Sequence, residues 1–337
     1  MESLLGASID GRYAIQAALG GGGTSHVYRA RDEQTGDVVA IKVIAGAFQD
    51  EPRVKDRFTR EVAVLRRLSS PHIVRVHDAG VEAKRAYLIL DLIEGETLAA
   101  RLRREKKLPV SLALSIAKQV LLALRVAHEA GVVHRDIKPD NLMLRPEEYA
   151  PGVPLVTVLD FGFAKLTQAD GGTMPLALTK VGTAIGTPYY MAPEQGRGEA
   201  NVGAQADLYA LGAVLFECIA GRPPHVGESL EDIMRAHAQN PAPDIREFVP
   251  RAPEPLANFL KKALARKTEK RFRDAEHMQA RLELVLVSAS PQRARERRAK
   301  MMALSAVALV LGVMVTLACI RACGTPSSSG ASSIQKE

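Results

Sequence analysis

The sequence predicts an α+β protein in which a two-lobed domain, strands first and helices after, is followed by one C-terminal transmembrane helix. Short apolar, β-branched runs separated by turns fill residues 13–44, which is typical of strands. From residue 112 onward, apolar residues recur mainly at helical spacing. Residues 301–320 carry no charge. A length of 337 residues leaves room for such a domain and an appendage.

Composition narrows the classes of function. With 47% hydrophobic and 25% charged residues, the chain suits a globular protein with a sizeable core. Its three cysteines (Cys218, Cys319, Cys323) show neither a disulfide framework nor metal-ligand spacing. Much of the net charge of +7 sits between Arg293 and Lys300, where five basic residues face one acid. No zinc-finger spacing and no basic–aromatic repeat occurs, so no nucleic-acid partner is expected.

The first two strands, expected over residues 13–19 and 26–31, are joined by a glycine-rich turn at residues 20–25. Glycine lets the backbone approach phosphate oxygens closely and offer them its N–H groups. Taken alone, the turn is equally well explained as a flexible hairpin.

The next expected strand, residues 37–44, contains Lys42 among apolar residues. A buried ammonium group needs an anionic partner, although a lysine that reaches solvent from an edge strand is the alternative. The helix expected over residues 54–68 places Glu61 on its apolar stripe, which is unusual for a carboxylate. Glu61 is therefore the expected partner of Lys42. Another strand is expected at residues 87–90.

A helix expected over residues 112–130 leads into the segment V-H-R-D-I-K-P-D-N-L, residues 133–142. This segment sets an acid (Asp136), a base (Lys138) and an amide (Asn141) at short intervals between two apolar stretches. A loop held at both ends in a core, with its polar groups turned into a cleft, has this pattern. Further along the chain come a strand, the tripeptide D-F-G and then A-P-E.

These motifs, in this order, resemble the protein kinase family, with its G-x-G-x-x-G-x-V, V-A-I-K, H-R-D-x-K-x-x-N, D-F-G and A-P-E. The resemblance covers residues 10–288. It implies a small antiparallel sheet with one helix, hinged to a larger helical lobe. It also implies ATP with Mg²⁺, or Mn²⁺ as the alternative, and protein substrates. The lysine two residues after Asp136 resembles the serine/threonine branch. Ser25 replaces the family's third glycine.

The resemblance assigns roles to individual residues. Asp136 accepts the proton of the substrate hydroxyl, and Lys138 balances charge on the transferred phosphoryl group. Lys42, paired with Glu61, holds the α- and β-phosphates. The implied metal ligands are Asn141 and Asp160. The implied nucleotide-binding residues, besides Lys42, are Gly20, Gly22, Val27, Ala40, Leu90, Asp91, Ile93 and Met143.

Residues 163–191 have the position of the family's activation segment. Arg135, next to Asp136, is a cation that kinases with this arginine neutralise with a phosphate on that segment. Thr187 is expected to bond Asp136 and Lys138 and to shape the substrate site. Three threonines are candidate phosphorylation sites, the last two being best placed: Thr173, Thr179 and Thr183.

Three structural features are also expected in the second lobe. Asp207 should bond the backbone of the catalytic loop, and Glu194 should pair with Arg271. The connection between Asn141 and the strand at residues 155–159 is longer than the family usually has. Its Pro and Gly residues favour a surface excursion between two strands.

Residues 301–320 would form a helix roughly 30 Å long, which matches a bilayer core. The alternative, a buried core helix, normally carries a polar face. The basic residues before the span place the N-terminal side in the cytoplasm, and no signal peptide is expected. The spacing of Ala308, Gly312 and Thr316 allows a homodimer through the span.

The expected organisation is an extension (1–9), a kinase domain (10–288), a basic linker (289–300), the span (301–320) and a disordered extracytoplasmic tail (321–337). Within the domain, the first lobe covers residues 10–90, the hinge 91–95 and the second lobe 96–288.

The favoured interpretation is a bacterial serine/threonine protein kinase anchored in the inner membrane, with its catalytic domain in the cytoplasm. The bacterial assignment rests on the single-span layout and the Ala/Arg-rich composition. One alternative is a membrane-bound pseudokinase scaffold that transfers no phosphate, and another is a small-molecule kinase. A scaffold has no chemical need for the full set of catalytic residues, and the long activation segment favours a protein substrate.

Overall fold

The structure is a computed structural model that describes residues 4–21, 25–44, 52–82, 85–161 and 188–289. The chain divides into two compact units, Met1–Leu286 and Val287–Glu337. All elements described below belong to the first unit, apart from the last residues of the final helix. The expected span and tail lie outside the described residues, as do Gly22 and the four activation-segment threonines with predicted roles, Thr173, Thr179, Thr183 and Thr187.

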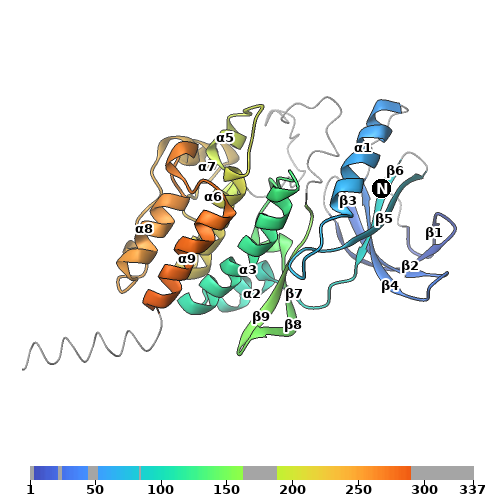
Figure 1. Cartoon of the computed structure of the whole chain (residues 1–337), viewed down its shortest axis with the longest axis horizontal. Helices are drawn as coiled ribbons and strands as arrows, with labels where there is room; N and C mark the ends of the chain where they lie inside the picture. The colour runs from blue at the N-terminus through green and yellow to red at the C-terminus, as the bar shows by residue number, and fades with distance from the viewer. Residues whose placement is uncertain (1–3, 22–24, 45–51, 83–84, 162–187, 290–337) are drawn as a thin grey trace, which may run out of the picture. The chain divides into compact units, whose positions relative to one another are not determined.

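The first lobe is built on a six-stranded antiparallel sheet in the order β1-β2-β3-β4-β6-β5 (Figure 1). Its strands are β1 (Ser8–Ile9), β2 (Tyr13–Gly21), β3 (Ser25–Asp32), β4 (Val38–Ile44), β5 (Val76–Glu82) and β6 (Arg85–Asp91). Strands β2, β3, β4 and β6 confirm the four predicted strands to within a few residues, whereas β1 and β5 were not predicted.

Alternation along β4 divides the sheet into two faces. Val39, Ile41 and Val43 belong to one buried cluster with residues of β2, β3 and β6, including Tyr28 and Ile89. Burying a side chain of this size stabilises the fold by about 1.5–3 kcal/mol. Successive residues of a strand point to opposite faces. The residues between these three, Ala40 and Lys42, therefore face the other side of the sheet.

Helix α1 (Pro52–Leu65) carries the expected apolar stripe, since Phe58, Val62 and Leu65 are all buried. The prediction that the helix extends to Leu68 is wrong. After Leu65 the backbone tightens to i→i+3 bonds, with Leu68 N donating to Leu65 O at 3.1 Å. Pro71 follows shortly, and a residue before proline disfavours helical geometry.

A second, three-stranded sheet joins the lobes. It contains β7 (Glu96–Thr97), β8 (Leu142–Ala150) and β9 (Val153–Val158) in that order. The predicted hinge, residues 91–95, lies between β6 and β7. Gly95 has a φ of 138°, and a Cβ there would come within 2.2 Å of the Leu144 carbonyl oxygen. Only glycine fits this close passage.

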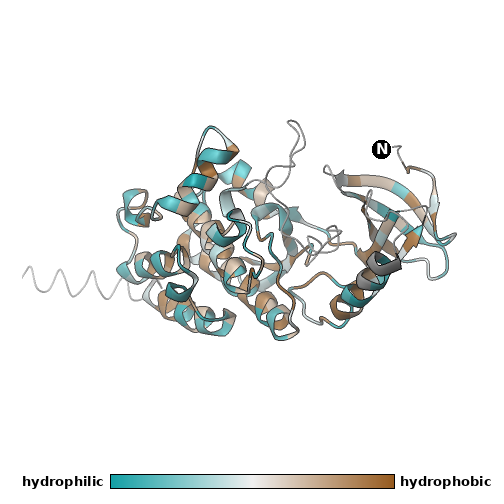
Figure 2. Cartoon of the chain, turned by 90° about the horizontal axis from the view of Figure 1, so that it is seen from above, coloured by the Kyte–Doolittle hydropathy of each residue, from teal (hydrophilic) through white to brown (hydrophobic). Residues whose placement is uncertain are grey.

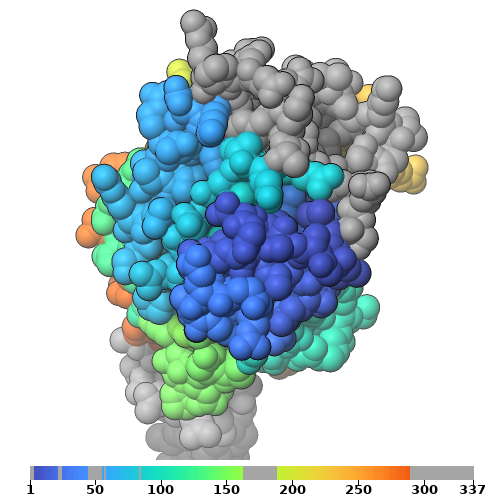
Figure 3. All heavy atoms as spheres, turned by 90° about the vertical axis from the view of Figure 1, so that its right-hand side faces the viewer, coloured from blue at the N-terminus to red at the C-terminus, as the bar shows by residue number. Residues whose placement is uncertain are grey.

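The predicted surface excursion after Asn141 is a bulged hairpin. Strands β8 and β9 extend past β7 and pair as far as Ala150 and Val153, with register shifts between Leu144 and Glu148 and between Glu148 and Ala150, and with Gly152 in the turn at a φ of 71°. In Figure 3 the hairpin is seen as green atoms on the surface, below the blue atoms of the first lobe. Because the polar segment pairs with itself, it lengthens both strands.

The second lobe is mainly helical, as expected (Figure 1). Its helices are α2 (Leu98–Glu105), α3 (Val110–Glu129), α5 (Pro193–Gly196), α6 (Gln205–Ala220), α7 (Leu230–Gln239), α8 (Glu254–Ala263) and α9 (Ala275–Ala289). Short 3-10 turns are η1 (Pro139–Asn141), η3 (Pro188–Tyr190), η4 (Ile245–Glu247) and η5 (Thr268–Lys270).

Helices α3 and α6 form the centre of this lobe, and almost every residue of α6 is buried. Figure 2 shows apolar (brown) and polar (teal) residues alternating along the surrounding helices. Among the described residues, only α3 is long and apolar enough to cross a membrane. Because 56% of its most apolar stretch is buried in the lobe, α3 has the character of a core helix.

The predicted Glu194–Arg271 pair is confirmed. Arg271 Nη1 and Nη2 donate to the two carboxylate oxygens of Glu194 at 2.6 and 2.7 Å. Arg271 also donates to three backbone carbonyls, of Gln205, Ala265 and Arg266. Both side chains are almost completely buried, so this paired and fully bonded arginine fastens α5 to η5.

Candidate active site

Asp207, the fully buried third residue of α6, holds the catalytic loop from below, as predicted. Its Oδ2 accepts from His134 N at 2.8 Å, and its Oδ1 accepts from Arg135 N at 2.7 Å. His128 Nε2 lies 2.8 Å from the same Oδ2, a contact that the sequence did not reveal. The carboxylate therefore fixes the backbone immediately before Asp136.

His134 ties the loop to the D-F-G segment. Its Nδ1 accepts from Asp136 N at 3.2 Å, and its Nε2 lies 2.7 Å from Leu159 O. Because Nδ1 accepts, the proton belongs on Nε2, which donates to the carbonyl. The ring also meets Phe161 edge-on at 4.7 Å. One buried imidazole thus fixes the two segments that carry Asp136 and Asp160.

Asp136, Lys138 and Asn141 converge as predicted. Lys138 Nζ lies 2.6 Å from Asp136 Oδ2, and Asn141 Nδ2 donates to the same oxygen at 3.1 Å. Asn141 Nδ2 also donates to Asp136 O at 2.8 Å. Both amide hydrogens are used in this way, so the amide oxygen is left as the acceptor. The Asp136 side chain is 48% exposed and can meet a hydroxyl group from solvent.

Lys42 contacts an acid that the sequence did not assign to it. Its Nζ lies 2.7 Å from Asp160 Oδ2. Lys42 stands on the face of β4 opposite the buried cluster, and Asp160 follows β9 by two residues. A buried ammonium group requires a nearby anion, and Asp160 supplies it. Glu61 is partly exposed on α1, and its pairing with Lys42 stays a prediction.

The expected nucleotide-binding residues of the first lobe form one patch. Gly20 is paired with Val27, Val27 with Lys42, and Ala40 with Leu90 across neighbouring strands. Directly opposed residues in a sheet project to the same face. Since Ala40 and Lys42 are two residues apart, all five lie on the face that carries the ammonium group.

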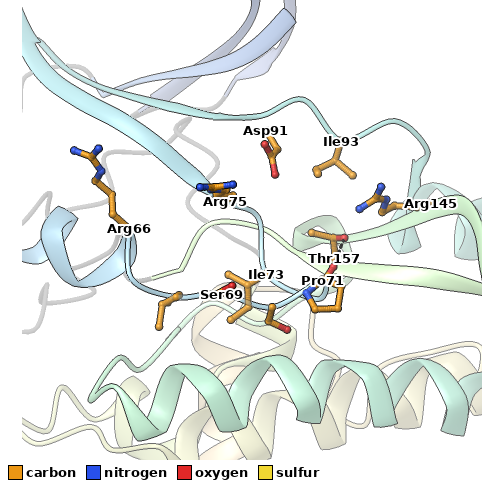
Figure 4. Close-up of a pocket in the computed structure, with 11 residues that line it drawn as sticks. Arg66, Ser69, Pro71, Ile73, Arg75, Asp91, Ile93, Arg145 and Thr157 are labelled. Carbon is orange, nitrogen blue, oxygen red and sulfur yellow. Dashed lines mark hydrogen bonds between the residues drawn. The ribbon is translucent and has the colours of Figure 1, made fainter. Parts of the chain in front are cut away.

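The remaining candidates come from the hinge and from β8. Met143 is paired with Thr97 and is partly buried beside the hinge. Asp91 lies opposite Val39 and therefore points away from the nucleotide patch. The Asp91 and Ile93 side chains line a separate cavity (Figure 4). The hinge can therefore contribute to the patch through its backbone, as the sequence predicted.

Two residues of the site have left-handed backbone conformations, which only glycine adopts without cost. Arg135 has a φ of 68° and Asp160 a φ of 61°. Such strain costs on the order of 1–3 kcal/mol per residue and persists only where surrounding contacts impose it. Asp207 and His134 supply those contacts. Asp10 and Lys106, outside the site, have similar φ values, so the strain supports a functional role for the two segments only together with these contacts.

Arg135 uses only part of its hydrogen-bonding capacity within the described part of the chain. Its carbonyl accepts from Gln195 Nε2 at 2.8 Å, and its Nη2 donates to Val202 O at 3.2 Å. Its Nε is buried without a hydrogen-bond partner among the described residues. This charged group retains capacity to bind an anion.

Sequence reasoning missed several supporting residues. Tyr190 donates its hydroxyl to Glu217 Oε2 at 2.5 Å, and burial raises the pKa of both groups. Glu217 is an acid surrounded by apolar residues near the end of helix α6, which was a usable signal. Gln195 and His128 offered none, because their contacts span 60 and 79 residues of sequence.

The donor set fits Mg-ATP. Magnesium prefers oxygen ligands and is commonly held by one or two protein groups together with phosphate oxygens. The carboxylate of Asp160 and the amide oxygen of Asn141 are such groups. No cluster of three or more His, Cys, Asp or Glu residues exists in the described part of the chain. These residues therefore suit a metal shared with a phosphorylated ligand.

Residues 13–282 match the family described as "Protein kinase domain". Serine/threonine-protein kinase PknD of Mycobacterium tuberculosis is 36% identical over 266 residues, which are 79% of this chain and 38% of that protein. PknE of Mycobacterium bovis is 34% identical over 286 residues, 85% and 48% of the two chains. The probable kinase PknB of Lactococcus lactis is 34% identical over 268 residues, 79% and 41%. The chain thus spans less than half of these relatives.

Among solved structures, the Mycobacterium tuberculosis PknI kinase domain superposes with a TM-score of 0.65 at 27% identity. The superposition covers 84% of this chain and 100% of that domain. Rad53 residues 1–466, solved in complex with AMP-PNP, gives a TM-score of 0.63 at 25% identity. That match covers 80% of this chain and 64% of Rad53. These neighbours confirm the predicted two-lobed fold.

Proposed function

Because this chain belongs to the protein kinase family, in its bacterial serine/threonine branch, we propose that it transfers the γ-phosphoryl group of Mg-ATP to serine and threonine hydroxyls of proteins. The observation that carries this proposal is the geometry around Asp136. Its Oδ2 is held by Lys138 at 2.6 Å and by Asn141 at 3.1 Å, while the side chain remains open to solvent.

Asp136 takes the proton of the substrate hydroxyl as that oxygen bonds to the γ-phosphorus. The bond from phosphorus to the bridging oxygen breaks, and its electron pair leaves with ADP. Lys138, adjacent to Asp136, balances the charge on the phosphoryl group in flight. Asp160 and Asn141 hold Mg²⁺, or Mn²⁺, which neutralises phosphate charge. Their positions are fixed by His134 and by the Leu159 N–Asn141 O bond of 2.9 Å.

Lys42 binds the α- and β-phosphates from the face of the sheet that also presents Val27, Ala40 and Leu90 to the adenine. The glycine turn, through Gly20 and Gly22, covers the phosphates. Met143 and the hinge backbone around Asp91 and Ile93 complete the nucleotide site. Glu61 serves as the second anionic partner of Lys42 when Asp160 turns to the metal.

The names of the relatives support protein substrates over small molecules. A scaffold without phosphotransfer is disfavoured, because a lysine, two acids and an amide with catalytic geometry have no role in it.

The test uses the full chain in detergent with Mg-ATP, a general protein substrate and a panel of small hydroxyl compounds. We expect phosphate in the protein and none in the small compounds. The opposite distribution would refute the proposal.

Arg135 Nε is buried and has no hydrogen-bond partner within the described part of the chain, which supports regulation by phosphorylation. We propose that phosphate on Thr179 or Thr183, with Thr173 as a further candidate, orders the activation segment against this guanidinium. Thr187 would then shape the substrate site. The double variant Thr179→Ala, Thr183→Ala should lose most activity. Full activity of enzyme shown by mass spectrometry to carry no phosphate there would remove the idea.

We propose that residues 301–320 anchor the kinase in the bacterial inner membrane as a single span, with the catalytic domain in the cytoplasm. The support is the length of the uncharged stretch and the basic residues before it. A homodimer through Ala308, Gly312 and Thr316 is part of this proposal. Protease added to intact spheroplasts should leave the kinase domain whole. Cleavage of the domain would reverse the orientation.

A further inference from the structure

A cavity of about 360 Å³ lies on the side of the hinge away from Lys42 (Figure 4). It is open to solvent and is lined by the segment between α1 and β5, by the hinge residues Asp91 and Ile93, and by strands β8 and β9. Asp91 lies opposite Val39, whose side chain belongs to the buried cluster rather than to the nucleotide patch. The residues assigned to phosphoryl transfer do not line this cavity.

The lining carries an excess of positive charge. Arg66, Arg75 and Arg145 contribute three guanidinium groups against the single carboxylate of Asp91, a net charge of +2 among the lining residues. That carboxylate is already bonded to His77 Nε2 at 2.6 Å. Figure 4 shows Arg75 and Arg145 on either side of the space below Asp91 and Ile93.

The arginines are held only weakly by other acids. The Arg75 side chain is exposed and makes no hydrogen bond or ion pair within the described part of the chain, although its backbone carbonyl accepts from Asp91 N at 3.1 Å. Arg66 lies 3.5 Å from Asp78, and both side chains are about half exposed. Arg145 donates to Glu147, its near neighbour on β8, at 2.7 and 3.1 Å. Exposed pairs of this kind contribute about 0–1 kcal/mol, so an incoming dianion can displace them.

Hydrogen bonds connect the strands that line the cavity to neighbouring elements. Gln119, fully buried on α3, donates to Pro154 O at 3.0 Å and accepts from Val156 N at 2.9 Å. Thr157 Oγ1 donates to Pro71 O at 3.2 Å and links β9 to the segment after α1. These contacts anchor the unusually long β8–β9 hairpin, which carries Arg145. The hairpin therefore completes a built pocket.

We propose that this cavity binds a phosphorylated serine or threonine side chain of a protein. Guanidinium forks match phosphate oxygens in geometry and charge, and clustered arginines are a general means of recognising phosphopeptides. The apolar floor, formed by Leu68, Pro71 and Ile73, suits the carbon atoms next to the phosphate. The volume exceeds that of a lone phosphate ion and leaves room for flanking peptide.

The test measures fluorescence anisotropy of a labelled peptide whose only hydroxyl side chain is a phosphothreonine. It uses the full chain in detergent without ATP, so it does not depend on phosphotransfer activity. We expect the phosphopeptide to bind at least tenfold more tightly than its unphosphorylated twin and than a glutamate version. Equal binding of the glutamate version, or displacement by inorganic phosphate at equal concentration, would overturn recognition of a phosphorylated side chain.

Variants locate the binding site. Arg75→Ala and Arg145→Ala should each weaken binding roughly tenfold, as expected for loss of a charge-assisted hydrogen bond. Arg251→Ala, which removes an exposed arginine outside the cavity, should change nothing. Arg75→Lys keeps the charge and should give an intermediate loss. If Arg135→Ala abolishes binding while Arg75→Ala and Arg75→Lys bind normally, the phosphate sits at the catalytic loop and the proposal is wrong.

Discussion

Asp207 and His134 show how single buried side chains determine the shape of the catalytic loop. Asp207 accepts from two consecutive backbone N–H groups, and His134 accepts from the N–H of Asp136. With these donors satisfied, the chain can hold Arg135 at a positive φ. The position of Asp136 therefore depends on residues that take no part in the chemistry.

Replacing Asp207 with asparagine tests that dependence. The amide has one acceptor oxygen where the carboxylate has two, so one backbone N–H of the loop stays unpaired at a cost of about 1–3 kcal/mol. Asp207→Asn should lower kcat strongly while the KM for ATP changes little. Asp244→Asn, at an exposed position, is the control. An unchanged kcat in Asp207→Asn would mean that the loop keeps its shape without this clamp.

The Glu194–Arg271 pair makes a second prediction at this scale. Glu194→Ala leaves a buried guanidinium without its counter-ion, which typically costs 3–5 kcal/mol. Urea unfolding should therefore show a large drop in stability. Glu199→Ala removes an exposed pair with Arg197 and should cost less than about 1 kcal/mol. Similar losses in the two variants would contradict the assigned importance of burial.

Packing between elements explains where the sequence-based predictions of structure held and where they did not. The stripe of α1 was readable because Phe58, Val62 and Leu65 follow helical spacing. The end of α1 was set by the turn before Pro71, and the hairpin by pairing of β8 with β9. Such pairing depends on strand register, which local composition does not encode. The contact between Lys42 and Asp160, which the sequence did not reveal, likewise depends on how the two lobes meet.

The contact between α6 and α7 carries a pH-dependent term. The Tyr209 hydroxyl oxygen lies 2.7 Å from His237 Nδ1, within hydrogen-bonding distance. The ring centroids of His237 and His225 are 4.7 Å apart. Burial lowers the pKa of His225 to about 4, and burial with the neighbouring His225 lowers the pKa of His237 to about 3. In the unfolded chain, histidine has a pKa near 6.5. Between about pH 6.5 and pH 4 the unfolded chain therefore binds more protons than the folded protein. Stability should therefore fall as pH falls from about 6.5 toward 4.

The size of this effect is measurable by urea unfolding at several pH values. Each histidine contributes at most about 1.4 kcal/mol per pH unit. His225→Leu removes one titrating group and should flatten the slope between pH 6.5 and 4. An identical slope in wild type and variant would show that these rings do not govern acid stability.

At the scale of the whole molecule, the catalytic groups come from both lobes, and contacts between the segment after α1, β4 and the end of β9 hold them together. Val74 N donates to Val158 O, Val158 N donates to His72 O, and Lys42 meets Asp160 at 2.7 Å. The ordered motifs predicted this assembly, since each carries its own chemistry. They did not reveal the cavity behind the hinge, because Arg66, Arg75 and Arg145 share no motif and meet only in the fold.

The central claim is that Asp136 makes this chain an active serine/threonine kinase. The most direct test incubates phosphatase-treated full chain and a general protein substrate with Mg-ATP, and then identifies phosphorylated residues by mass spectrometry. The wild type should place phosphate on serine and threonine, whereas Asp136→Asn should bind ATP and transfer essentially none. Equal phosphate with both proteins, or none with the wild type, would contradict the account.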